Sequence, residues 1–222
     1  MNELLFLLQV LLAFSCTYLF FRIGKEGLFV WLGMLALLAN LFVSKQITLF
    51  GLEVTASDAF AVALILSLNL LQEFYGATVA KKGGMIAVAA QLAFLLFSEL
   101  HLAFTPNQHD TSHAAYQTLL GIYPRLLFAS CFTLFVVQWF DRSVFTWLKN
   151  QLPQRSFSAR NVISVSMSQC LDTAIFSVIG LYGLVANITE VFLMSFGIKV
   201  LLILMLPLFT SLLKKSSYGV QV

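Results

Sequence analysis

Long apolar runs alternate with short polar segments along almost the whole chain. Runs near twenty residues, the length that an α-helix needs to cross a membrane, occur at about 4–21, 28–44, 56–75, 84–104, 118–140, 161–183 and 189–213. This pattern predicts an all-α fold, a polytopic transmembrane bundle of about seven helices. Because the spans and their short connections take up nearly all of residues 1–222, we expect a single integral membrane domain.

Composition agrees with this class and excludes others. Hydrophobic residues make up 59% of the chain and charged residues 10%, as in membrane proteins. The connections are too short for a separate globular catalytic domain. The net charge of +3 comes from basic residues scattered over loops, without the basic patch and interleaved aromatic residues that are typical of nucleic-acid binding. We therefore expect contact with membrane lipid and no direct contact with nucleic acid.

The distribution of basic residues predicts the orientation of the chain. With seven spans, one side of the membrane receives nearly all loop lysines and arginines, and Lys45 alone falls in an opposite loop. The positive-inside rule then places the N-terminus outside and the C-terminus in the cytoplasm. The first run lacks a basic segment before it and a clear cleavage site, so we interpret it as a retained helix. The basic residues assigned to the cytoplasmic side are Arg22, Lys25, Lys81, Lys82, Arg142, Lys149, Arg155, Arg160, Lys214 and Lys215.

Two polar stripes interrupt the apolar runs. Each has members at positions i, i+3, i+4 and i+7, which lie on one face of a helix. The first stripe consists of Asn69, Gln72, Glu73 and Gly76. The second consists of Gln169, Asp172, Thr173 and Phe176. Ionisable groups inside a membrane usually face the bundle interior or a watery cavity, so we expect both stripes to face inward. Uncharged members can also simply hydrogen-bond neighbouring helices.

Asp172 and Lys199 are predicted to lie at the same depth in the membrane. Their helices are joined by a short turn near residue 186. At 1.5 Å per residue, Asp172 lies roughly 21 Å and Lys199 roughly 19 Å from that turn. The two side chains can therefore meet as an ion pair, which makes both charges tolerable. Such a pair is either structural or part of a functional site.

Two further polar residues lie near the ends of apolar runs. Arg125 follows Tyr123-Pro124 in the outer part of the fifth run, where it either snorkels outward or pairs with an anion inside the bundle. The second run ends at Ser44-Lys45. Lys45 is close enough to water to be ordinary, so Asn40 is the better candidate for the bundle interior.

No metal site or cofactor is predicted. His109 and His113 have the i, i+4 spacing of a shared metal site, with His101 nearby in the sequence. They fall in a polar outer loop and lack the general base of an H-E-x-x-H motif, which favours solvated loop histidines. The cysteines form no C-x-x-C pair and lie in apolar runs, as small hydrophobic residues do.

As an ordered set, these residues resemble the queuosine precursor transporter family, which is similar to vitamin uptake transporters. The resemblance covers roughly residues 30–213, the six-helix core of the family, and leaves the first helix as an addition. The family often has Asp where this chain has Asn69, and a proline earlier in that helix, where this chain has residues such as Val62. The motifs are Asn40 with Lys45, the stretch Asn69 to Gly76 ending Gln72-Glu73-Phe74-Tyr75-Gly76, Arg125 with Ala129-Ser130, Asp141, Gln169-x-x-Asp172-Thr173-x-x-Phe176, and Lys199 with Pro207.

The resemblance implies a multi-pass carrier in the cell inner membrane rather than an enzyme. Its expected substrates are 7-deazaguanines, such as 7-cyano-7-deazaguanine, 7-aminomethyl-7-deazaguanine or queuine, imported for tRNA modification. The candidate substrate-binding residues are Asn40, Asn69, Gln72, Glu73, Arg125, Gln169, Asp172, Thr173, Phe176 and Lys199.

The residue types suit such a substrate. A guanine-like edge offers a ring N–H beside an amino group, and a carboxylate such as Asp172 or Glu73 can accept both in parallel. Phe74, Tyr75 or Phe176 would stack on the ring or form part of the core. Two other classes stay open: a substrate-capture subunit of another uptake system, and an intramembrane enzyme that uses these two carboxylates or the loop histidines. The sequence does not separate proton coupling from facilitated diffusion.

Overall fold

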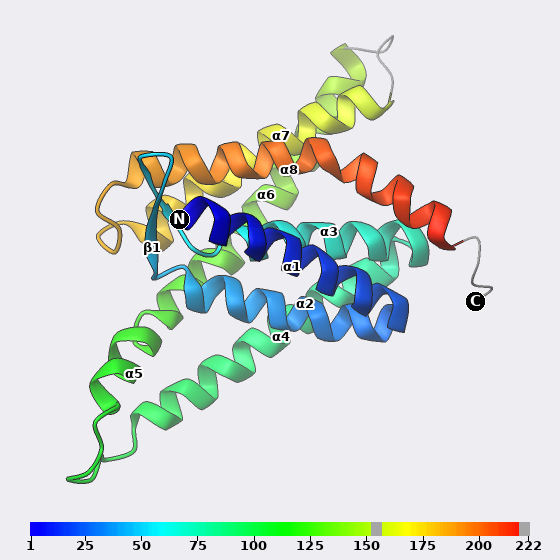
Figure 1. The fold of residues 1–222 in the computed structure, drawn as a ribbon. Helices are drawn as coiled ribbons and strands as arrows, with labels where there is room; N and C mark the ends of the chain where they lie inside the picture. Colours follow the sequence, from blue (N-terminus) through cyan, green and yellow to red (C-terminus); the bar gives the residue numbers. More distant parts are fainter. Residues whose placement is uncertain (152–156, 218–222) are drawn as a thin grey trace.

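The structure is a computed structural model that describes the backbone of residues 1–151 and 157–217 (Figure 1). Within these ranges, the side chains of residues 138, 141, 142, 145, 149, 157–162, 202, 203 and 205–217 are not described. The expectations for several residues therefore fall outside the described side chains: Asp141, Arg142, Lys149, Arg155, Arg160, Pro207, Lys214 and Lys215.

Long helices run back and forth across the molecule and form one bundle (Figure 1). Six segments of the described residues are long and apolar enough to cross a membrane, and the expected seventh run coincides with helix α8. The predicted helical class is confirmed, whereas the number of spans and their orientation stay predictions. The helices are α1 (Asn2–Ile23), α2 (Lys25–Phe42), α3 (Asp58–Tyr75), α4 (Ala77–Leu102), α5 (His113–Leu120), α6 (Tyr123–Gln151), α7 (Phe157–Phe176), the π-helical turn η1 (Ser177–Leu181) and α8 (Ile188–Ser217).

Two connections predicted as loops are nearly absent. Gly24 alone separates α1 from α2, and Gly76 alone separates α3 from α4. Their φ angles of 114° and 90° lie in a region that side chains with a Cβ rarely adopt, so a single glycine suffices to end one helix and begin the next. The expected loop at 81–83 is therefore wrong: Lys81 and Lys82 lie on α4 and are exposed.

Residues predicted as an irregular loop form a β-hairpin instead. Strands β1 (Gln46–Leu49) and β2 (Leu52–Thr55) pair antiparallel, with Leu49 opposite Leu52. Phe50 and Gly51 form the turn with φ angles of 51° and 83°, the double positive φ of a type I′ turn. An isolated two-stranded hairpin is marginally stable in water, so contacts with the rest of the bundle must hold it.

Polar contacts fasten this hairpin at both sides. On one side, the Gln46 side chain donates to the Leu184 carbonyl at 3.1 Å and accepts from the Ala186 amide at 3.0 Å. The Glu53 amide donates to Glu190 Oε2 at 2.9 Å. On the other side, Asn2 Nδ2 donates to the Thr48 carbonyl and Glu3 Oε1 accepts from the Phe50 amide. The hairpin therefore joins the start of α1 to the turn between η1 and α8.

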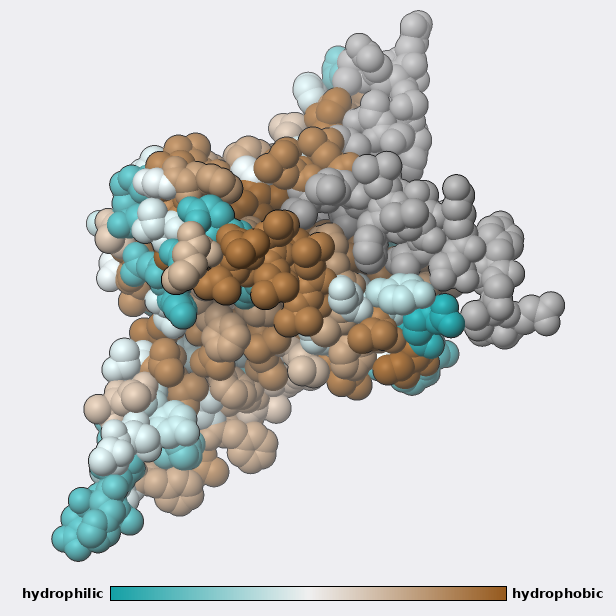
Figure 2. Space-filling view, viewed as in Figure 1, coloured by the Kyte–Doolittle hydropathy of each residue, from teal (hydrophilic) through white to brown (hydrophobic). Residues whose placement is uncertain are grey.

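Apolar side chains both fill the bundle and cover its outside. Helices α1 to α4 share a core with fully buried Leu28, Leu32, Leu66 and Leu70. Figure 2 shows apolar surface over the helices, with hydrophilic surface at the hairpin end, at the α4–α5 tip and at the α1–α2 connection. Exposed apolar side chains over a helix bundle, such as Phe135, are typical of contact with lipid.

The close approach of α1 and α2 gives a first prediction. A Cβ at Gly27 would lie 2.5 Å from the Phe20 carbonyl oxygen and 2.8 Å from Ile23 Cβ. Backbone atoms cannot easily shift to make room for it. Gly27→Ala is therefore expected to lower the free energy of unfolding by about 1–3 kcal/mol, measured by thermal unfolding in detergent. Gly84→Ala is the control, because a Cβ there meets nothing within 4 Å. Equal melting temperatures for the two variants would contradict this packing.

Candidate functional site

A buried ion pair joins α7 and α8, as the sequence predicts. Lys199 Nζ donates to Asp172 Oδ2 at 2.8 Å and to Thr173 Oγ1 at 3.1 Å. The Lys199 side chain is 9% exposed, whereas that of Asp172 is 31% exposed. The lysine is therefore enclosed, while the carboxylate that neutralises it is still partly open.

A third charged residue, Asp58, belongs to the same region and was not among the predicted site residues. Asp58 begins α3 and is buried. Its Oδ2 accepts a 2.8 Å hydrogen bond from Ser195 Oγ, and Ser195 lies one turn before Lys199 on α8. Asp58 is therefore linked through Ser195 to the face of α8 that carries Lys199. The sequence feature that could have identified Asp58 is a carboxylate inside the predicted apolar run at 56–75.

Two candidate site residues, one polar and one aromatic, flank Asp172 on its own helix. Gln169 lies one turn earlier, and its Oε1 is buried without a hydrogen-bond partner among the described residues. Phe176 lies one turn later and packs against a buried cluster that contains Val43 and Leu126. An unpaired buried acceptor is unfavourable by about 1–3 kcal/mol, and the place of Gln169 in a binding site stays a prediction.

Asn40 belongs to a second polar cluster between α2, α4 and α6. Its Nδ2 donates to Gln91 Oε1, and its Oδ1 accepts from Ser130 Oγ at 3.0 Å. Asn40 and Gln91 are both buried, which confirms Asn40 as an interior residue. Gln91 was not predicted, although a glutamine in the middle of the apolar run at 84–104 is a usable signal. The cluster hydrogen-bonds three helices together.

Among the described residues, Arg125 donates to backbone carbonyls and not to an acidic side chain. Its Nε donates to the Ile179 carbonyl at 2.9 Å and its Nη2 to the Tyr182 carbonyl at 2.6 Å. These carbonyls belong to the π-helical turn η1 and the residue after it. A π-helical turn shifts the backbone hydrogen-bond register, and Arg125 satisfies the carbonyls at this end. No anion pairs with Arg125 among the described residues, and its exposure agrees with the alternative in which it points outward.

The first polar stripe lies apart from the ion pair. Asn69, Gln72 and Glu73 are exposed and occupy the second half of α3. Glu73 is fifteen residues after Asp58, about 22 Å along the helix. Asp172, Thr173 and Lys199 are thus brought together, whereas Asn69, Gln72 and Glu73 stay at the opposite end of α3, and their place in a binding site stays a prediction.

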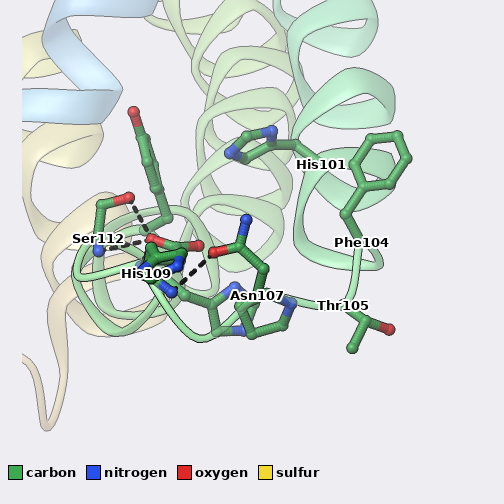
Figure 3. Close-up of a pocket in the computed structure, with 10 residues that line it drawn as sticks. His101, Phe104, Thr105, Asn107, His109 and Ser112 are labelled. Atoms are coloured by element: carbon green, nitrogen blue, oxygen red, sulfur yellow. Dashed lines mark hydrogen bonds between the residues drawn. The ribbon is translucent and has the colours of Figure 1, made fainter.

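The histidine segment lines a pocket of about 450 Å³ at the α4–α5 connection (Figure 3). Asp110 Oδ1 accepts hydrogen bonds from the amide and the hydroxyl of Ser112 and from the amide of His113. These bonds, led by that of the Ser112 amide, lower the pKa of the Asp110 carboxyl. Among the described residues, no three His, Cys, Asp or Glu side chains gather as metal ligands would. The absence of a bound metal stays a prediction.

Comparison with known proteins assigns the family. Residues 55–213 match the profile of the family described as "Putative vitamin uptake transporter". A "Probable queuosine precursor transporter" from Bacillus subtilis (strain 168) is 30% identical over 185 residues, which cover 82% of this chain and 81% of the relative. No solved structure matches the chain. The chain therefore belongs to the vitamin uptake transporter family and is a multi-pass membrane transporter, not an enzyme.

Proposed function

We propose that this chain imports 7-deazaguanine precursors of queuosine across the cell inner membrane for tRNA modification. The relative from Bacillus subtilis carries the name of a queuosine precursor transporter, which supports this class of substrate. The observation that carries the proposal is the partly open carboxylate of Asp172, held in place by the buried Lys199.

The Asp172 carboxylate can still accept hydrogen bonds, which suits the edge of a guanine-like base. Lys199 donates to Oδ2 of Asp172, and among the described residues no donor contacts its Oδ1. A 7-deazaguanine presents a ring N–H and an amino group side by side, which a carboxylate accepts in parallel. The buried Oε1 of Gln169, one helical turn away, offers a further acceptor for a polar group of the same ligand.

The aromatic candidates are less free to take part. Phe176 packs against the buried cluster of Val43 and Leu126. Phe74 contacts Phe21, with ring centroids 4.8 Å apart. Stacking on a substrate would require either ring to leave its core contacts. Recognition by hydrogen bonds at Asp172 and Gln169 therefore explains binding with less rearrangement than recognition by stacking.

The test is uptake of labelled 7-cyano-7-deazaguanine by cells that lack their own synthesis of queuosine precursors. Asp172→Asn is expected to reduce initial uptake at least about tenfold, because an amide presents a donor to the ring N–H or the amino group in place of an acceptor. Reconstitution of the purified chain in liposomes separates autonomous transport from capture for another complex.

Asp110→Asn is the matched control, since it removes a carboxylate that is exposed in the α4–α5 connection. It is expected to leave uptake unchanged. Glu73→Gln tests whether the exposed end of α3 takes part. If Asp172→Asn transports at the wild-type rate with normal membrane expression, the assignment of this carboxylate to the substrate is wrong.

A further inference from the structure

Lys199 lies between two carboxylates that come from different helices. Asp172 on α7 receives its hydrogen bond directly. Asp58 on α3 is held by Ser195, which precedes Lys199 by one turn on the same face of α8. Among the described residues, no direct ion pair joins Lys199 to Asp58. Asp58 is thus a nearby carboxylate that the ammonium does not use in this arrangement.

The burial of Lys199 makes this second carboxylate necessary. Lys199 is 7% exposed and Asp58 5%. An ammonium that loses its only carboxylate partner in such surroundings is strongly destabilising. A substrate that binds the Asp172 carboxylate would leave the Lys199 ammonium without a carboxylate partner. Asp58 is the carboxylate placed to compensate, because Ser195 holds it beside the face of α8 that carries Lys199.

We propose that Lys199 exchanges partners during transport, pairing with Asp172 in the empty protein and with Asp58 when substrate occupies Asp172. This exchange rests on the proposed function of Asp172. The lysine side chain has a flexible four-carbon stem and a compact ammonium, which suits it to a change of partner. Asp58 is then a positioning residue: it contacts no substrate but receives the cation that substrate displaces.

The first test needs no substrate and measures melting temperatures in detergent. Asp172→Asn and Asp58→Asn each leave Lys199 one carboxylate, so each is expected to cause a modest decrease. The double variant leaves none, and its decrease should exceed the sum of the two by about 4 °C or more. Adding Lys199→Met to the double variant should remove this excess. Ser67→Ala is the control, because Ser67 is buried on α3 but bonds only within its own helix; combined with Asp172→Asn it should be additive.

The second test measures uptake kinetics of 7-cyano-7-deazaguanine. Asp58→Asn should raise KM about tenfold or more, because substrate binding now leaves Lys199 without a partner. Asp58→Glu, which keeps the carboxylate, should restore most of the affinity. Additive melting temperatures, or an unchanged KM in Asp58→Asn, would overturn the exchange. Normal uptake by Asp172→Asn would instead reject the substrate assignment, and the melting temperatures still decide whether Asp58 can hold Lys199.

Discussion

Replacing Lys199 with methionine is expected to lower the free energy of unfolding by about 3–5 kcal/mol. Methionine resembles the apolar part of lysine in length, so little packing is lost. The loss arises from charge: Asp58 is buried and Asp172 is largely enclosed, and among the described residues of α8 no other cation is left to neutralise them. Thermal or denaturant unfolding in detergent measures this change.

Lys45→Met is the matched control for this prediction. Lys45 is exposed between the end of α2 and the start of β1. Its replacement should change the free energy of unfolding by less than about 0.5 kcal/mol. Neutralising both carboxylates in the Lys199→Met background should recover most of the lost stability, since an uncharged cluster needs no counter-ion. A decrease below about 1 kcal/mol in the single variant would show that water, rather than lysine, neutralises the carboxylates.

Replacing Trp31 with alanine is expected to cost about 3 kcal/mol of stability. Trp31 is buried between α1 and α2, its Nε1 donates to Thr17 Oγ1 at 2.8 Å, and its ring stacks on Phe20 with centroids 5.0 Å apart. Large aromatic side chains in cores contribute about 3–5 kcal/mol against alanine. We expect the lower end, because helix association in lipid depends on packing without the hydrophobic driving force of water.

Two control variants separate the contributions of this tryptophan. Trp31→Phe keeps the stacking and loses the hydrogen bond to Thr17, so it should cost about 0.6–1.7 kcal/mol. Trp139→Ala removes a tryptophan that is 64% exposed on α6, and it should change the melting temperature little. A similar effect of Trp31→Ala and Trp139→Ala would show that α1 is not held to α2 through Trp31.

The sequence was sufficient to predict the helical class and the central ion pair. Apolar length alone predicts membrane helices. The short turn near residue 186 fixes Asp172 and Lys199 at equal depth, and the structure joins them at 2.8 Å. Asp58 was missed because an aspartate at the start of a helix is ordinarily explained by the helix N-terminus. Its contact with Ser195 depends on how α3 packs against α8, which hydrophobic periodicity does not specify.

The connections were predicted less well, for a local reason and a distant one. A single glycine with positive φ replaces a loop at Gly24 and at Gly76, and the presence of a glycine in a connection between apolar runs does not reveal its φ. The hairpin depends on distant partners such as Leu184 and Ala186, which lie far along the chain from Gln46. Such contacts become predictable only once the arrangement of the helices is known.

The attachment of the hairpin constrains the design of chimeric transporters. The family match begins at residue 55, which makes that position a natural crossover point for exchanging the matched region between relatives. A chimera built there would keep Leu184, Ala186 and Glu190 but take the residues facing them from the other parent, because Gln46 and Glu53 lie before the crossover. A crossover between Lys45 and Gln46 keeps the hydrogen bonds of the hairpin to Leu184, Ala186 and Glu190 within one parental sequence.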